Sequence, residues 1–210
     1  MQLQDHLPLQ LHLHEPGLHS RPVMPARGAG RECAESCMDY LTLELVHHYR
    51  DAQQGPSLQA ALDAVGERVG RQLAERYARD RPPLTEPLEA MKWLCKEFWG
   101  EVFRKPVDNL RTNHRGTFVL RDTQFRWLWR LAQNQMPPQL GLSLPPAVPK
   151  TELAADYLVL PCAIVRGALA QLGLDCSVAA DAASLPQVDF TVVLAGGGTG
   201  GAGAAARGAR

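Results

Sequence analysis

The stretch of the chain whose residue types could do chemistry is NLRTNHRGTFVLRD, residues 109–122. Arg111, Asn113 and His114 lie close together in it, and such groups bind phosphates or transfer protons. The stretch has neither the glycine pattern of a phosphate loop nor the nucleophile elbow of a hydrolase. The step from Asn113 to Gly116 has the composition of a tight turn, in which glycine takes a positive φ. We therefore predict a β-hairpin tip here, whose three polar residues are a candidate second surface for a neighbouring protein.

Histidine and cysteine side chains near the N-terminus raise the alternative of a metal site. Histidines occupy positions 6, 12, 14 and 19, and Cys33 and Cys37 form a C-x3-C pair. Metal ligands are held in place by surrounding hydrogen bonds, which a Pro-flanked tail does not supply. A zinc finger would also need a second pair of ligands. No metal site and no cofactor are predicted, and the chain is not expected to be an enzyme.

The composition excludes several classes of partner. The 210 residues include 22 Lys+Arg and 22 Asp+Glu, so the formal net charge is zero. Nucleic-acid-binding domains are usually basic, as are polybasic membrane anchors, so neither nucleic acid nor direct lipid binding is expected. The cysteines are scattered and number five, which does not suggest a disulfide framework. No uninterrupted run approaches the ~18 apolar residues of a membrane span. These features predict a cytoplasmic protein.

The two ends lack the apolar pattern of a folded core. Residues 1–34 mix Pro, Gly, His and Gln, and residues 195–210 form a Gly/Ala-rich tail. Both segments are predicted to be disordered. Residues 35–194 remain as a single domain of ordinary size, with a Pro-rich loop insertion near residues 136–149.

A first amphipathic helix is predicted over residues 35–52. Met38, Leu41 and Leu45 follow helical spacing, and Leu43 and Val46 widen the apolar face. The helix is expected to stop at the Gly-Pro step that follows residue 54, and Ser57 can cap the next helix.

The second helix, over residues 57–80, has a stripe that includes Leu62, Val65 and Val69. Gly66 and Gly70 lie four residues apart within it. Because glycine costs up to about 1 kcal/mol in a helix interior, the pair predicts that another helix approaches closely.

The rest of the domain mixes helices and strands. A third helix is predicted over residues 88–105, and strands flank the turn at residues 113–116. Residues 124–133 are predicted as an irregular extension or short strand. A buried helix over residues 151–173 contains Pro161, which must kink it or mark its first turn, and ends at Gly173. Strands at residues 176–180 and 188–194 complete an α+β fold, with helices covering a small antiparallel sheet.

Several stretches together resemble a known family. In order and spacing, LEAMKWLCKEFW, VFRKPVDNLRTNHRGTFVLRD, CAIVRGALAQLG and VDFTVVL resemble the subunit-6 group of the TRAPP vesicle-tethering complex. GERVGRQLAER is similar to the G-x-R-[VI]-G-x-x-L pattern of the wider Bet-three-like family. The resemblance covers about residues 35–194, and its most specific part is DNLRTNHRGTFVLRD.

This resemblance implies helices packed on one side of a small twisted antiparallel sheet, and a non-catalytic architectural role in ER-to-Golgi and Golgi traffic. It implies pairing with the Bet-three subunit through the N-terminal helices, and contact with other TRAPP subunits. The chain would meet a Rab GTPase, and the Golgi and vesicle membranes, only through the complex, which exchanges the nucleotide of that GTPase. The expected partner interface comprises Met38, Leu41, Leu45, Leu62, Val65, Gly66, Val69 and Gly70.

The alternative is a module of the same fold that binds an acyl chain or another hydrophobic ligand. The Bet-three paralogue holds an acyl chain in a hydrophobic channel and carries a cysteine just before the third helix. In this chain RPPLTEP supplies no cysteine there, and Cys95 falls well inside the helix. This difference favours the interaction subunit.

Overall fold

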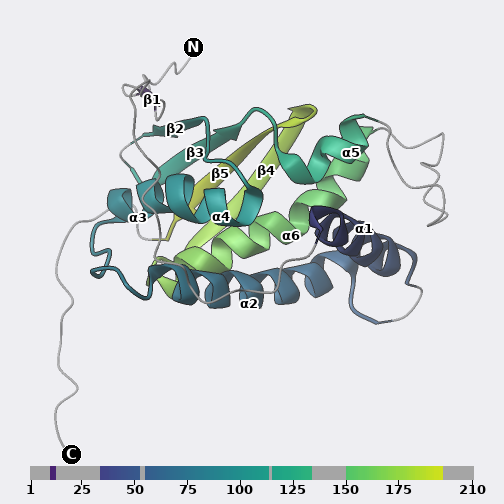
Figure 1. The fold of residues 1–210 in the computed structure, drawn as a ribbon, viewed down its shortest axis with the longest axis horizontal. Helices are drawn as coiled ribbons and strands as arrows, with labels where there is room; N and C mark the ends of the chain where they lie inside the picture. The colour runs from purple at the N-terminus through teal and green to yellow at the C-terminus, as the bar shows by residue number, and fades with distance from the viewer. Residues whose placement is uncertain (1–9, 13–33, 53–54, 114, 134–149, 196–210) are drawn as a thin grey trace, which may run out of the picture.

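The computed structural model describes residues 10–12, 34–52, 55–113, 115–133 and 150–195. A layer of helices lies on one side of an antiparallel sheet, which confirms the predicted α+β class (Figure 1). The predicted Pro-rich loop and the Gly/Ala-rich tail beyond Ala195 lie outside the described residues, as do most of residues 1–34.

The first two helices form where the sequence predicts them. They are α1 (Glu35–Asp51) and α2 (Leu58–Ala78). Ser57 caps α2, since its hydroxyl accepts a hydrogen bond of 3.3 Å from the backbone N–H of Ala60.

The third predicted helix is three consecutive segments: α3 (Pro87–Trp93), the π-helical η1 (Leu94–Phe98) and α4 (Trp99–Phe103). Within η1 the carbonyl of Cys95 accepts a hydrogen bond of 2.9 Å from the backbone N–H of Val107. This bond ties the helix to the start of the sheet, because Val107 leads directly into the first strand of the hairpin.

The sheet has five strands in the order β1-β2-β3-β5-β4, and every neighbouring pair is antiparallel. They are β1 (Gln10–His12), β2 (Asn109–Thr112), β3 (Thr117–Asp122), β4 (Cys176–Ser184) and β5 (Gln187–Leu194). The predicted hairpin is β2–β3, and Gly116 at its turn has the expected positive φ of 88°. β1 was not predicted, because it belongs to the segment expected to be disordered.

Residues 126–132 correct another prediction. They form the 3-10 turn η2 (Arg126–Leu128) and the short helix α5 (Trp129–Ala132), not an extension or a strand. Phe125, Leu128 and Leu131 are buried at three-residue spacing, which is a helical period. That spacing leaves the intervening Arg126 and Arg130 partly exposed.

The last helix, α6 (Lys150–Gln171), is the centre of the core. By length and composition α6 could span a membrane, but 78% of its most apolar 18-residue stretch is buried inside the protein. It continues through Pro161 and ends as predicted. There Gly173 has φ 82°, and the N–H of Leu174 donates to the carbonyl of Leu169 at 2.9 Å.

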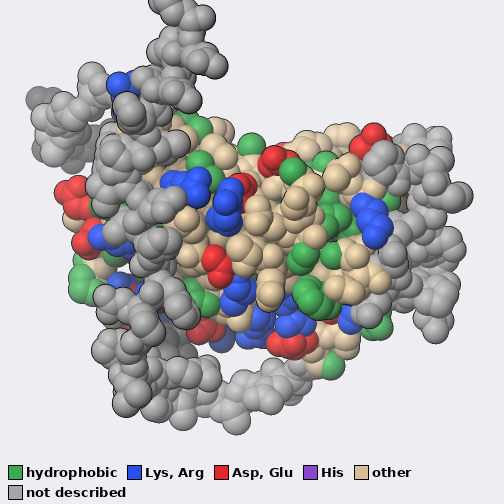
Figure 2. Space-filling model, turned by 90° about the horizontal axis from the view of Figure 1, so that it is seen from above, with side chains coloured by type: hydrophobic (Ala, Val, Ile, Leu, Met, Phe, Trp, Pro, Cys, Tyr) green, Lys and Arg blue, Asp and Glu red, His purple; other side chains and the backbone are tan. Residues whose placement is uncertain are grey.

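The two faces of the sheet differ in polarity. Alternate residues of β3 and β5, such as Leu120 and Phe190, face the helices and are fully buried. On the other face Arg121 of β3 donates two hydrogen bonds to Asp189 of β5, at 2.7 and 2.5 Å. Figure 2, which shows the side away from α2, has basic and acidic side chains interspersed among uncharged groups.

Candidate partner-binding surface

The close helix approach predicted from Gly66 and Gly70 is present within the chain itself. A Cβ added at Gly70 would lie 2.0 Å from the carbonyl oxygen of Ile164 on α6, and one at Gly66 would lie 2.6 Å from the Cβ of Ala163. Contact is reciprocal, because a Cβ at Gly167 of α6 would lie 2.1 Å from the carbonyl oxygen of Glu67 on α2. Only glycine allows the two backbones to approach so closely.

This packing corrects part of the predicted interface. Leu62, Gly66 and Gly70 are buried beneath α6, so they are not available to another protein. Val65 and Val69 are half-buried and pack against the chain's own core. Helical periodicity shows that this face of α2 is covered, but it does not reveal that α6 of the same chain covers it.

Helix α1 has two apolar faces, whereas its sequence pattern predicts a single wide one. Leu43 and Val46 are only 5% and 1% exposed and point into the core. Met38 and Leu41 are 41% and 54% exposed, and Leu45 beside them is half-buried. Since each residue turns a helix by about 100°, Leu41 and Val46 lie roughly 140° apart around the axis. The structure therefore leaves Met38 and Leu41 exposed, with the half-buried Leu45 at their edge, and we call these three residues the α1 stripe.

A second exposed surface lies where α1 meets α5, and the sequence did not predict it. Trp129 and Tyr40 are 44% and 42% exposed, and the guanidinium of Arg130 lies over the Tyr40 ring at 5.2 Å. Arg130 also donates to Asp39 at 3.0 Å, which joins the two helices. A hollow of about 430 Å³ lies here, lined by Asp39, Gln124, Arg126, Trp129 and Arg130. Trp, Tyr and Arg are residue types that often dominate the binding energy of interfaces.

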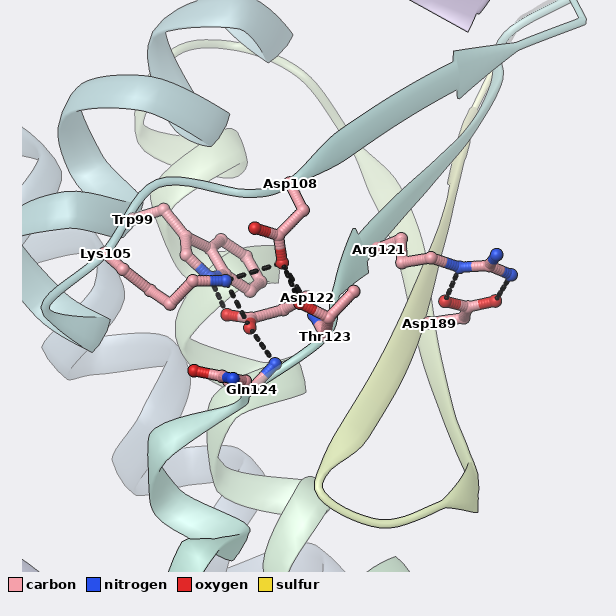
Figure 3. Close-up of polar contacts among 8 residues, drawn as sticks. All are labelled: Trp99, Lys105, Asp108, Arg121, Asp122, Thr123, Gln124 and Asp189. Carbon is pink, nitrogen blue, oxygen red and sulfur yellow. Dashed lines mark hydrogen bonds and ion pairs between the residues drawn. The ribbon is translucent and has the colours of Figure 1, made fainter. Parts of the chain in front are cut away.

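A buried carboxylate fixes the loop that leads to this surface (Figure 3). Asp122 is fully buried, and its oxygens accept hydrogen bonds from Nε1 of Trp99 at 3.0 Å and Nζ of Lys105 at 2.9 Å. The backbone N–H of Gln124 also donates to Asp122 at 3.0 Å. Charge-assisted bonds of this kind satisfy a carboxylate that would otherwise be costly to bury. Because η2 begins two residues after Gln124, the same bonds hold the start of η2 and α5 in place.

Asp108 completes this cluster from the other side of Lys105. It accepts hydrogen bonds from Nζ of Lys105 at 2.6 Å and from the backbone N–H of Thr123 at 2.7 Å. Burial by itself would raise the pKa of Asp108, but the bonds from Lys105 and Thr123 outweigh it and lower the pKa. Burial likewise acts to lower the pKa of Lys105, and its bonds to Asp108 and Asp122 raise it instead. Lys105 and Asp108 thus form a charged brace at neutral pH.

In the described part of the chain, the predicted hairpin residues Arg111 and Asn113 do not form a common site. The side-chain oxygen of Asn113 accepts hydrogen bonds from the backbone N–H groups of Arg115 at 2.9 Å and Thr117 at 3.0 Å, which closes the turn. Arg111 is half-buried on β2, and His114 lies outside the described residues. Within the described part of the chain, Asn113 therefore has a role in the turn, and the proposed second surface stays a prediction.

No group of three or more His, Cys, Asp or Glu side chains suited to a metal ion occurs among the described residues. Cys95 is the cysteine of the third predicted helix and therefore bears on the acyl-binding alternative. It is fully buried, and this burial raises the pKa of its thiol. A thiol in this state is a poor nucleophile, because the reactive form is the thiolate.

Comparisons with known proteins fit this geometry. Residues 38–195 match the family model described as transport protein particle (TRAPP) component. Trafficking protein particle complex subunit 6b of Danio rerio is 34% identical over 164 residues, which cover 76% of this chain and 96% of that protein. Subunit 6A of Homo sapiens is 37% identical over 162 residues, which cover 74% of this chain and 94% of that protein.

A solved structure also resembles the chain in fold. It is a trafficking protein particle complex subunit 3 from Naegleria fowleri, covalently bound to palmitic acid. The TM-score is 0.54 at 12% identity, over 77% of this chain and 97% of that one. At this identity the likeness concerns the fold alone.

Proposed function

Because the chain belongs to the family of transport protein particle (TRAPP) components, we propose that it is a non-catalytic, architectural subunit of that complex and binds the Bet-three subunit through the α1 stripe. Relatives that align with most of the chain are named as subunits of the trafficking protein particle complex, which supports a role in that complex. No enzyme family is indicated among them.

The observation that carries the proposal is the exposure of Met38 and Leu41 on a helix whose other apolar face is already buried. Complete burial of an exposed large apolar side chain contributes about 1.5–3 kcal/mol, and Met38 and Leu41, which are 41% and 54% exposed, can still gain roughly half of that each. Two such side chains on one stripe, with Leu45 beside them, therefore favour a protein partner over solvent. Val65 and Val69, which are half-buried on α2, remain predicted interface residues.

The wider role follows from membership of the complex. In our proposal the chain supports the assembly that exchanges nucleotide on a Rab GTPase, and it meets that GTPase only through other subunits. Its position at ER-to-Golgi transport vesicles and at the cis- and trans-Golgi would likewise be peripheral and mediated by the complex. The mixed charge on the face in Figure 2 supports a protein partner better than an anionic lipid surface.

Binding of an acyl chain is not proposed for this chain. Palmitic acid is bound covalently in the Naegleria fowleri subunit 3, but the likeness to that protein concerns the fold. The buried Cys95 gives no reason to extend the modification to this chain.

Co-expression with the Bet-three subunit of the same organism tests the proposal. Size-exclusion chromatography with light scattering should show a one-to-one heterodimer. Leu41→Asp should raise the dissociation constant by at least about tenfold, because it places a charge in an apolar contact. A matched control is Ser177→Asp, which adds the same charge at an exposed position of β4.

Two monomers that remain separate at micromolar concentration would overturn the proposed pairing, although the family and the fold would stand. Equal weakening by Ser177→Asp and Leu41→Asp would remove the α1 stripe as the interface. Circular dichroism of each purified variant separates loss of binding from loss of fold, since Leu41 is more than half exposed in the isolated chain.

A further inference from the structure

The edge of the sheet beyond β2 is covered by residues from the N-terminal segment. β1 pairs antiparallel with β2, with Gln10 opposite Arg111, Leu11 opposite Leu110 and His12 opposite Asn109. The three residues of β1 thus cover three of the four residues of β2. In Figure 1, β1 lies beside β2 at the margin of the sheet.

An uncovered strand edge presents a row of unpaired N–H and C=O groups, which can pair with a strand of another chain. The opposite edge, β4, carries a register irregularity between Asp181 and Ser184 and the exposed charge of Asp181, both of which discourage such pairing. In the described part of the chain β2 has a regular register with β3 and no such irregularity. Its edge therefore depends on another segment for cover.

The segment that supplies this cover lies outside the family domain. The family match spans residues 38–195, whereas β1 ends at residue 12. The alignment with the subunit 6b relative covers 96% of that protein but only 76% of this chain. The cover on β2 is thus supplied by a part of this chain that the matched domain does not include.

We propose that the edge of β2 is a binding site for an extended polypeptide strand, and that this chain fills it with its own residues Gln10–His12. Main-chain hydrogen bonds provide the affinity at a strand-addition site of this type. An attached strand has a high effective concentration, so even a three-residue strand can occupy the edge. A longer strand from another protein could bind there only after β1 is displaced.

Side chains next to this edge leave hydrogen-bonding capacity for a docked strand. Oδ1 of Asn109 and Nε of Arg111 are enclosed and have no hydrogen-bond partner in the described part of the chain. They are one acceptor and one donor, two residues apart on the same face of β2. A polar segment suits this edge better than an apolar one, because it can satisfy both atoms.

The test is amide hydrogen exchange in the full chain, resolved by residue with NMR. The variant is Gln10→Pro/Leu11→Pro, because proline has no backbone N–H. Successive N–H groups of a strand point to opposite sides, so one of the two N–H groups that are removed points toward β2. The matched control is Gln10→Ala/Leu11→Ala, which also removes both side chains but keeps both N–H groups. In the proline variant the β2 amides that do not donate to β3 should exchange at least about tenfold faster than in the alanine variant.

The β2 amides that bond to β3 should keep their protection and serve as an internal control. A synthetic peptide of residues 8–14, added in trans, should restore protection in the proline variant and bind the wild-type chain at least about tenfold more weakly. Equal exchange in the proline and alanine variants, or equal binding of the peptide to both proteins, would overturn the proposal. Protection in the wild type that is lost on dilution would assign the edge to a second copy of the chain, and would overturn the assignment to Gln10–His12.

Discussion

Gly70 of α2 lies against the main chain of Ile164 of α6 so closely that no other residue fits. A Cβ at Gly70 would meet the carbonyl oxygen and carbon of Ile164 at 2.0 and 2.8 Å, and the backbone nitrogen of Ala168 at 2.9 Å. All three atoms belong to the backbone of α6, so a rotamer change cannot relieve the contact. The two helices must separate if the glycine is replaced.

We therefore expect Gly70→Ala to lower the free energy of unfolding by about 1–3 kcal/mol, although alanine is the better helix former. Gly100→Ala on α4 is the matched control, because no heavy atom lies within 4 Å of its added Cβ. That variant should be stabilised by up to about 1 kcal/mol. Urea unfolding followed by circular dichroism measures both, and a neutral Gly70→Ala would contradict the close contact of α2 and α6.

The two faces of α1 should respond differently to truncation. Leu43→Ala should cost about 2–5 kcal/mol, because Leu43 is buried in the core. Leu41→Ala should stay within about 0.5 kcal/mol in the isolated chain, because Leu41 is 54% exposed. Thermal unfolding of the chain without a partner compares the two. Similar losses would mean that α1 is rotated about its axis relative to the structure.

The brace around Lys105 should make stability depend on pH at both ends of the scale. The folded pKa of Asp108 is lowered from 3.8, so its contribution is present above that pH and is lost as the pH falls through the folded value. The folded pKa of Lys105 is raised from 10.5, so its contribution is present below that pH and is lost as the pH rises through the folded value.

Asp108→Asn should accordingly destabilise the protein at pH 7, and the difference from wild type should shrink below pH 3.8. Urea unfolding at several pH values measures this, with Glu101→Gln at an exposed position of α4 as the control. A difference that persists undiminished in acid would show that Asp108 acts through the shape of its side chain and not through its charge.

The thiols should react with alkylating reagents in an order set by burial. Among the four cysteines that lie in the described part of the chain, Cys37 is exposed and should be labelled first in the native protein. Burial raises the pKa of Cys176 to about 11 and that of Cys162 to about 12, and it raises the pKa of Cys95 as well. Because alkylation requires the thiolate, Cys95 and Cys162 should stay unlabelled at pH 8 until urea is added. Peptide mass spectrometry locates the label. Rapid native labelling of Cys95 would reopen the acyl-binding alternative.

Some predictions failed because their signals were too short or were misread. β1 has only three residues, which is too few for any apolar alternation to show. The helical spacing of Phe125, Leu128 and Leu131 was present in the sequence, but the aromatic residues around it suggested a strand. The hollow between α1 and α5 joins residues about 90 positions apart, such as Asp39 and Arg130, which no local pattern connects.

The local features could be predicted from the sequence alone: the cap at Ser57, the turn at Gly116 and the end of α6 at Gly173. These depend on residues close together in the chain, where backbone sterics and hydrogen bonds decide the conformation. Tertiary structure alone decided which apolar face of α1 is buried and which helix the glycines of α2 meet. Periodicity shows that a helix face will be covered, but packing between distant segments determines what covers it, and in this chain that packing leaves Met38 and Leu41 exposed.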